Sequence, residues 1–201
     1  LRATTLRGFG LTFGAIYSGF KRLLDLPEPN ALNLGVVVST TSYLTGSDER
    51  FYAYNTGAFL TRDTVALPDR TVRIPLAVGT GLSYANDRLL LAADWYYQNW
   101  SRFADPTGAE IRDSHRFGAG IELIPKKEPA APYTQRMAYR FGAFYNASYY
   151  ALRDEAINEF GLTAGLGLPV VGDTRLNIGA EYAFRGTTEK QLQKDKILRI
   201  S

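Results

Sequence analysis

The sequence of 201 residues has no cysteine, one histidine and one methionine. Without cysteine it has no disulfides, no thiolate metal ligands and no cysteine nucleophile. Long apolar stretches are also absent: 45% of the residues are hydrophobic, yet the longest unbroken run is five residues, Leu89 to Ala93. Because a membrane-spanning helix needs about 18 or more apolar residues, the sequence excludes transmembrane helices.

An excess of one charge sign is lacking as well. The chain carries 23 basic and 20 acidic residues, for a net charge of +3, and no like-charged block is longer than the two residues of Lys126-Lys127. This balance speaks against a nucleic-acid partner. A content of 13% aromatic residues excludes a disordered chain. No acidic run has calcium-loop spacing and no glycine-rich phosphate loop is present, so we expect neither a metal site nor a cofactor.

What the sequence does contain is strict alternation. In the segment 71–84, Val72, Ile74, Val78 and Leu82 alternate with small or polar residues. The same two-residue period recurs over 88–98, 116–123, 136–149, 159–168 and 175–185, and less strictly over 8–18 and 32–41. A period of two is typical of strands with one apolar face. The pattern therefore predicts an all-β chain.

The predicted strands run to about ten residues, the length that a tilted strand needs to cross a bilayer. Short turns at 84–88 and 170–174 alternate with longer polar connections at 103–114, 152–158 and 186–196, and the Pro-containing link 125–135 is the exception. Tight turns on one side and long loops on the other are typical of bacterial outer-membrane barrels. We therefore predict an antiparallel transmembrane β-barrel in the outer membrane of a Gram-negative bacterium.

The number of strands depends on the aromatic segment 51–59. If this segment belongs to long strands that project past the membrane, the count is nine, and if it is a separate crossing, the count is ten. The parity of turns and loops favours nine. Single-chain bacterial barrels have even strand numbers, so we expect residues 1–201 to form one outer-membrane β-barrel domain that lacks its N-terminal part and the end of its last strand. Consistent with this expectation, the chain begins at Leu1 and 196–201 reads as a shortened strand.

The polar half of the strands supplies the candidate functional residues. If the apolar half faces lipid, this half lines the barrel lumen. The charged candidates are Arg73, Asp94, Arg116, Glu122, Arg136, Arg140, Glu159, Arg175, Glu181 and Arg185, and two aromatic residues, Tyr96 and Phe144, share their face. The charges either pair across neighbouring strands as structural elements or select a passing solute. Likewise, the two rings either offer an apolar surface to a ligand or fill space.

An enzymatic role is not expected. A membrane hydrolase with a histidine base would need His115 to face the lumen, but His115 shares parity with the apolar Phe117 and Ala119. We therefore interpret His115 as an interfacial residue. Trp95, Tyr97, Trp100, Tyr145, Tyr149 and Tyr150 gather near the long-loop strand ends, whereas Tyr84 and Tyr133 lie near the short turns. Two such belts are typical of membrane interfaces.

Several hairpins resemble the C-terminal part of FadL-type outer-membrane proteins. The relevant stretches are Gly79-Thr-Gly-Leu-Ser-Tyr, Arg88-Leu-Leu-Leu-Ala-Ala-Asp-Trp-Tyr-Tyr-Gln-Asn-Trp, Arg136-Met-Ala-Tyr-Arg-Phe-Gly-Ala-Phe-Tyr and Asn177-Ile-Gly-Ala-Glu-Tyr-Ala-Phe-Arg-Gly-Thr-Thr. The Arg-Gly-Thr-Thr element is similar to divergent, Bacteroidetes-like members. The resemblance covers roughly residues 6–201.

The resemblance implies passive uptake of hydrophobic molecules such as long-chain fatty acids or aromatic hydrocarbons, through a barrel with an N-terminal hatch and a lateral exit. The expected partners are outer-membrane lipids, lipopolysaccharide and hydrophobic ligands, with no nucleic acid. A second hypothesis is a structural or anchoring barrel subunit of a cell-envelope complex that passes no solute.

Overall fold

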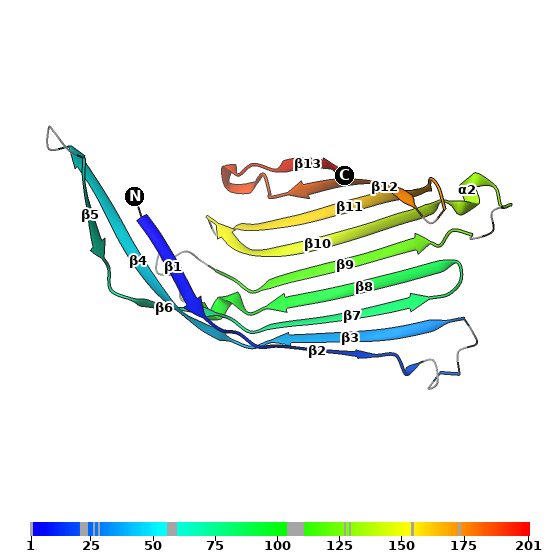
Figure 1. Ribbon diagram of the computed structural model, residues 1–201, viewed down its shortest axis with the longest axis horizontal. Coiled ribbons are helices and arrows are strands. Elements are labelled where there is room, and N and C mark those ends of the chain that lie inside the picture. The colour runs from blue at the N-terminus through cyan, green and yellow to red at the C-terminus, as the bar shows by residue number, and fades with distance from the viewer. Residues whose placement is uncertain are drawn as a thin grey trace.

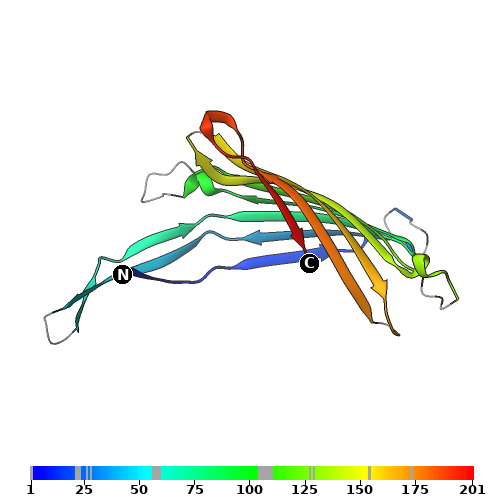
Figure 2. The ribbon, with the colours of Figure 1, turned by 90° about the horizontal axis from the view of Figure 1, so that it is seen from above.

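The computed structural model describes residues 2–20, 24–25, 27, 29–55, 60–103, 111–126, 128, 130–153, 155–172 and 174–201. These residues form two antiparallel sheets (Figure 1). The main sheet has the order β13-β12-β11-β10-β9-β8-β7-β3-β2. Its strands are β2 (Thr12–Tyr17), β3 (Ala31–Ser39), β7 (Ala77–Ala85), β8 (Leu89–Gln98), β9 (Ser114–Leu123), β10 (Ala138–Leu152), β11 (Glu155–Pro169), β12 (Arg175–Arg185) and β13 (Asp195–Ile200). Figure 2 shows that this sheet is twisted and curved. The prediction of an all-β fold of antiparallel strands is confirmed.

The second sheet, which we call the projecting sheet, consists of β1 (Arg2–Gly8), β4 (Ser42–Asn55), β5 (Leu60–Ala66) and β6 (Arg70–Ile74). Three of its strands continue strands of the main sheet: β1 leads into β2, β3 into β4, and β6 into β7. The projecting sheet extends from the end where the β8–β9 and β12–β13 connections lie (Figure 1). We call this end the long-loop end and the opposite one the short-turn end.

This arrangement decides the strand count in favour of nine. Residues 51–55 belong to β4 in the projecting sheet and 56–59 lie outside the described residues, so the aromatic segment is not a tenth strand of the main sheet. The predicted strand 71–84 is divided at Pro75–Leu76 into β6 and β7. Proline has no backbone N–H to donate to a ladder, and the sheet changes direction there.

The predicted loop 152–158 is wrong. β10 and β11 are each 15 residues long, and only residues 153 and 154 separate them. Arg153 has φ 56°, a left-handed conformation suited to a tight turn. The register between the two strands shifts between Ala147 and Ala151. At this irregularity the two-residue alternation of apolar and polar residues is interrupted, so the sequence pattern does not show that the strands continue to residues 152 and 155.

Short helices occupy some of the connections: η1 (Trp100–Arg102) between β8 and β9, α2 (Tyr133–Arg136) between β9 and β10, and η2 (Glu189–Gln191) between β12 and β13. In the part of the chain that the structure describes, no helix has the length and apolarity needed to span a membrane.

The main sheet has an apolar face and a polar face. Cross-strand register aligns apolar residues with apolar residues, for example Ala119 with Ala93 and Ala143. Along β11, Phe160, Leu162, Ala164 and Leu166 are exposed, whereas Gly161 and Gly167 on the other face are buried. Among the described residues the buried hydrophobic set is only Ala77, Ala138 and Ala183. A wide exposed apolar surface over so small a core is what a lipid-facing wall requires.

The two faces can be tested at neighbouring positions of β11. We expect Leu162→Arg to lower the free energy of unfolding in lipid bilayers by about 2–4 kcal/mol, because it places a charge on the lipid side. Thr163→Arg is the matched control, since residue 163 lies on the polar face directly opposite Glu181. Urea titration with heat-modifiable gel mobility measures both. Equal destabilisation by the two variants would contradict the lipid-facing orientation of the apolar face.

Candidate functional site

The polar face of the main sheet brings together most of the sequence-predicted candidates. Ten of the twelve lie in β8–β12 at alternate positions of that face, and the register places several directly opposite one another. These ten are Asp94, Tyr96, Arg116, Glu122, Arg140, Phe144, Glu159, Arg175, Glu181 and Arg185. Strand pairing thus collects residues separated by up to about ninety positions in the chain.

Two ion pairs lie toward the short-turn half of this face. Arg140 Nε donates to Glu122 Oε2 at 3.1 Å, and its NH1 donates to Asn177 Oδ1 at 3.0 Å. Arg199 of β13 pairs with Glu181 directly across the ladder. Each pair joins neighbouring strands, as the structural interpretation of these charges predicts. Because the side chains are partly exposed, each pair contributes on the order of 0.2–1 kcal/mol.

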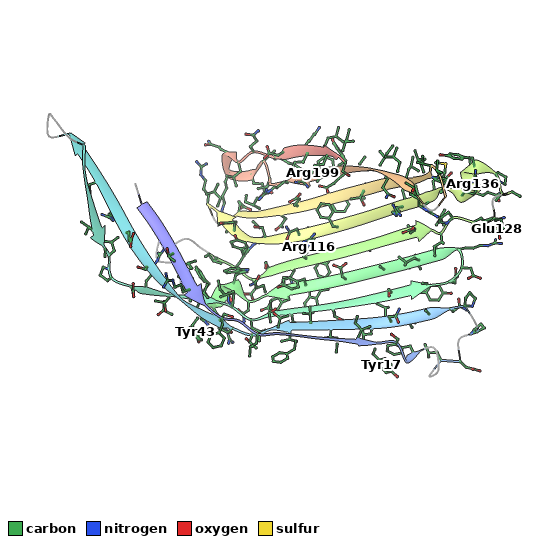
Figure 3. All side chains as sticks on the ribbon, viewed as in Figure 1. Tyr17, Tyr43, Arg116, Glu128, Arg136 and Arg199 are labelled. Carbon is green, nitrogen blue, oxygen red and sulfur yellow. The ribbon has the colours of Figure 1, made fainter. Side chains whose placement is uncertain are left out.

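A row of polar side chains crosses the sheet nearer the long-loop end. It consists of Tyr96, Arg116, Asn146, Glu159 and Arg185, each directly opposite the next on adjacent strands. We call it the upper row. It borders a cavity of about 350 Å³. Figure 3 shows Arg116 on β9.

Glycines form the floor between the upper row and the ion pairs. Gly118, Gly120 and Gly142 border a hollow of about 660 Å³ that the Glu122–Arg140 and Glu181–Arg199 pairs also border. The Phe144 ring lies where a Cβ on Gly161 would be, at 2.4 Å. Phe144 therefore fills space over a glycine, the simpler of its two predicted roles.

This packing gives a test on a single strand. Gly161→Ala forces the Phe144 ring to move, and we expect a loss of about 1–3 kcal/mol in stability from overpacking. Gly165→Ala is the control, because the nearest atom to its Cβ is Ile178 O at 3.5 Å, an ordinary contact. Denaturant unfolding of both variants provides the measurement. If Gly165→Ala costs as much as Gly161→Ala, the ring contact is not the cause.

Two candidates lie elsewhere. Arg73 is in β6 of the projecting sheet, with its guanidinium carbon 5.9 Å from the Tyr43 ring centroid. Arg136 is in α2, its guanidinium carbon 5.7 Å from the Tyr133 ring centroid, because the predicted strand 136–149 begins only at Ala138. Alternation alone could not show where a strand enters or leaves the main sheet.

Sequence reasoning missed two members of the polar face. Asn177 and Arg199 complete the hydrogen-bonded and ionic pairs, but neither carries a motif. Arg199 lies in the C-terminal segment, where the alternating pattern covers too few residues to predict a face. Only the β12–β13 register shows that Glu181 is its partner.

His115 lies on the apolar face, as its parity predicted. Its ring stacks with Trp95 and Phe117 and is tilted against Tyr97, and its Nδ1 accepts a hydrogen bond from Trp95 Nε1 at 3.4 Å. This aromatic group lies near the long-loop end of β8 and β9, where an interfacial belt is expected. Among the described residues no group of three or more histidine or acidic side chains is placed to hold a metal ion.

Asp113 ties the connection after η1 to the end of β8. Its carboxylate accepts hydrogen bonds from the Ser101 amide at 2.9 Å and the Tyr97 hydroxyl at 2.7 Å. Burial raises the pKa of Asp113, but these bonds and the nearby His115 lower it by more, so the net pKa lies below the usual value.

The direction of this shift predicts a pH dependence. A depressed folded-state pKa stabilises the fold above the unfolded value of about 3.9, and this stabilisation is lost as pH falls through the folded-state pKa. We expect Asp113→Asn to lower the thermal unfolding midpoint at pH 7 but to have little effect well below both pKa values. Circular dichroism melts at the two pH values test this expectation, and an equal drop at both would exclude the charge as the cause.

Known proteins similar to this chain include one protein family and one solved structure. No curated protein sequence matches the chain. Among solved structures, the crystal structure of a Pseudomonas aeruginosa FadL homologue matches with a TM-score of 0.41 and 12% identity, over 90% of this chain and 60% of that one. The chain thus spans less than two thirds of that structure's length. The BamG family model matches residues 1–201. This outer-membrane barrel-like protein therefore belongs to the BamG family.

Proposed function

We propose that the protein is a membrane-embedded β-barrel subunit of an outer-membrane assembly complex, the anchoring role that was the second hypothesis from sequence. The observation that carries this proposal is the match to BamG, a family related to β-barrel assembly in the outer membrane, along the whole of residues 1–201. In this role the apolar face contacts lipid, the polar face lines the lumen, and the chain contributes a binding surface rather than chemistry.

The projecting sheet supports this role. Residues 31–55, which form β3 and β4, number 25, whereas a tilted strand crosses the bilayer with about 9–11 residues. More than half of these residues therefore extend past the membrane. One face of the projecting sheet carries Leu6, Leu44 and Val72 together with charged residues such as Arg50 and Arg70. Because it continues barrel strands, it forms a stiff surface on which another subunit can dock.

Uptake of hydrophobic small molecules is the second candidate, and one observation favours it. A hollow of about 680 Å³ lies over Gly35, Gly79 and Gly81 beside Val37 and Tyr96. Mostly apolar walls with few polar groups suit a hydrophobic ligand. The assembly role is preferred because the match to the BamG family covers residues 1–201.

The test of the assembly role is removal of the outer part of the projecting sheet. We expect a variant in which residues 47–68 are replaced by a short turn to keep its heat-modifiable barrel but to lose co-purification with the barrel-assembly machinery from detergent-solubilised outer membranes. Depletion of the protein should lower the amount of folded outer-membrane barrels. The control variant shortens the 187–193 connection, which is also at the long-loop end.

The two candidate functions give opposite results. Unchanged co-purification and unchanged barrel levels on depletion would contradict the assembly role. Uptake of fatty acids by liposomes that contain the purified protein, above empty controls, would then favour transport.

A further inference from the structure

The cavity beside the upper row differs from the rest of the polar face. Its wall comes from five successive strands, β8 to β12, together with η1. Arg116, Glu159 and Arg185 line it with Asn146, and Trp100 and Tyr149 flank it. Charged, amide and aromatic side chains therefore converge on one space of about 350 Å³.

The charges of the upper row do not neutralise one another. Glu159 is directly opposite Arg185, yet within the described part of the chain the side chains of Arg116, Glu159 and Arg185 form no hydrogen bond or ion pair. On the same face, only a few residues away, Glu122 and Glu181 each have an arginine partner. Charges that face a partly enclosed space without partners are available to a ligand.

The aromatic side of the cavity is flat. The Trp100 ring stacks on Tyr149 with centroids 4.9 Å apart and planes 25° apart, and Tyr149 contacts Tyr150 at 4.2 Å. Such rings offer an extended apolar surface with polar tips. A ligand that lies between this surface and the upper row needs one apolar face and several polar groups.

We propose that this cavity binds an anionic saccharide, a sugar that carries a phosphate or carboxylate group. The guanidinium forks of Arg116 and Arg185 match the paired oxygens of such anions. Glu159 lies between them in the row and accepts hydrogen bonds only, so the ligand must also bring hydroxyl donors, and Asn146 can both donate and accept. The C–H face of the sugar ring then packs on the Trp100–Tyr149 surface.

This composition distinguishes the ligand from simpler ones. A neutral sugar would leave both guanidinium groups without an anion. Inorganic phosphate would leave Glu159 facing a like charge without the hydroxyl groups that satisfy it. The site goes beyond the proposed assembly role and does not rest on it.

The experiment is a titration of the full-length protein, purified in detergent, with glucose 6-phosphate, glucose and inorganic phosphate. Residues 1–201 contain two tryptophans, so Trp95→Phe leaves Trp100 as the fluorescent reporter of this part of the protein. We expect saturable binding of glucose 6-phosphate, about tenfold or more tighter than either other probe. Arg116→Gln or Arg185→Gln should weaken it about tenfold. Arg199→Gln, outside the cavity and paired with Glu181, should leave it unchanged.

Calorimetry repeats the titration without the fluorescent reporter. The absence of saturable glucose 6-phosphate binding, equal binding of inorganic phosphate, or an equal loss in Arg199→Gln would overturn the proposal. Competition by purified lipopolysaccharide distinguishes the source of the sugar. If lipopolysaccharide displaces bound glucose 6-phosphate at a concentration much lower than that of the sugar phosphate, the natural ligand is a phosphorylated lipid headgroup. If lipopolysaccharide does not displace it, the natural ligand is a free sugar. Either result supports the site.

Discussion

The fold depends on one constraint: every backbone N–H and C=O in a bilayer must find a partner within the protein. Between its two edge strands, β13 and β2, the continuous antiparallel ladder meets this constraint among the described residues, and the strand pairing also sets which face each strand side chain occupies. Since neighbours across the ladder share a face, a strand with one apolar and one polar half creates a sheet with two chemically different surfaces. Stability in this chain comes from the ladder and the lipid, because the buried hydrophobic core among the described residues is only three alanines.

The same ladder builds the candidate site. Arg140 meets Glu122 because β9 and β10 pair in a register that puts them opposite each other, and the upper row exists because four consecutive registers agree at one level of the sheet. The glycines at the centre of the polar face have no side chains, so the Phe144 ring and the longer charged side chains lie over them. The polar face therefore has two parts. Its short-turn half holds the ion pairs that join neighbouring strands, and the upper row holds charged side chains that a ligand can contact.

The projecting sheet shows how one set of strands serves two environments. β3 and β4 are nearly continuous in sequence, yet the first carries an apolar face in the membrane-crossing wall and the second extends beyond it. Pro75 and the register change between the β1–β4 and β2–β3 pairs mark the point where the sheet bends. The bend lies on the long-loop side (Figures 1 and 2), where water can hydrate an exposed sheet edge.

The sequence alone predicts the strand class, the two faces and the parity of individual residues such as His115 and Phe144, because a period of two is a local property of an extended chain. It does not show where strands leave the main sheet, so the expected positions of Arg73 and Arg136 and the expected loop over 152–158 differ from the structure. A bulge or bend moves the following side chains to the other face of the sheet, and the amino-acid composition of the segment gives no sign of it. Which charges pair and which stay available depends on the tertiary structure. Glu159 and Arg185 are directly opposite each other across the ladder, as Glu181 and Arg199 are, but in the described part of the chain only the second couple forms an ion pair.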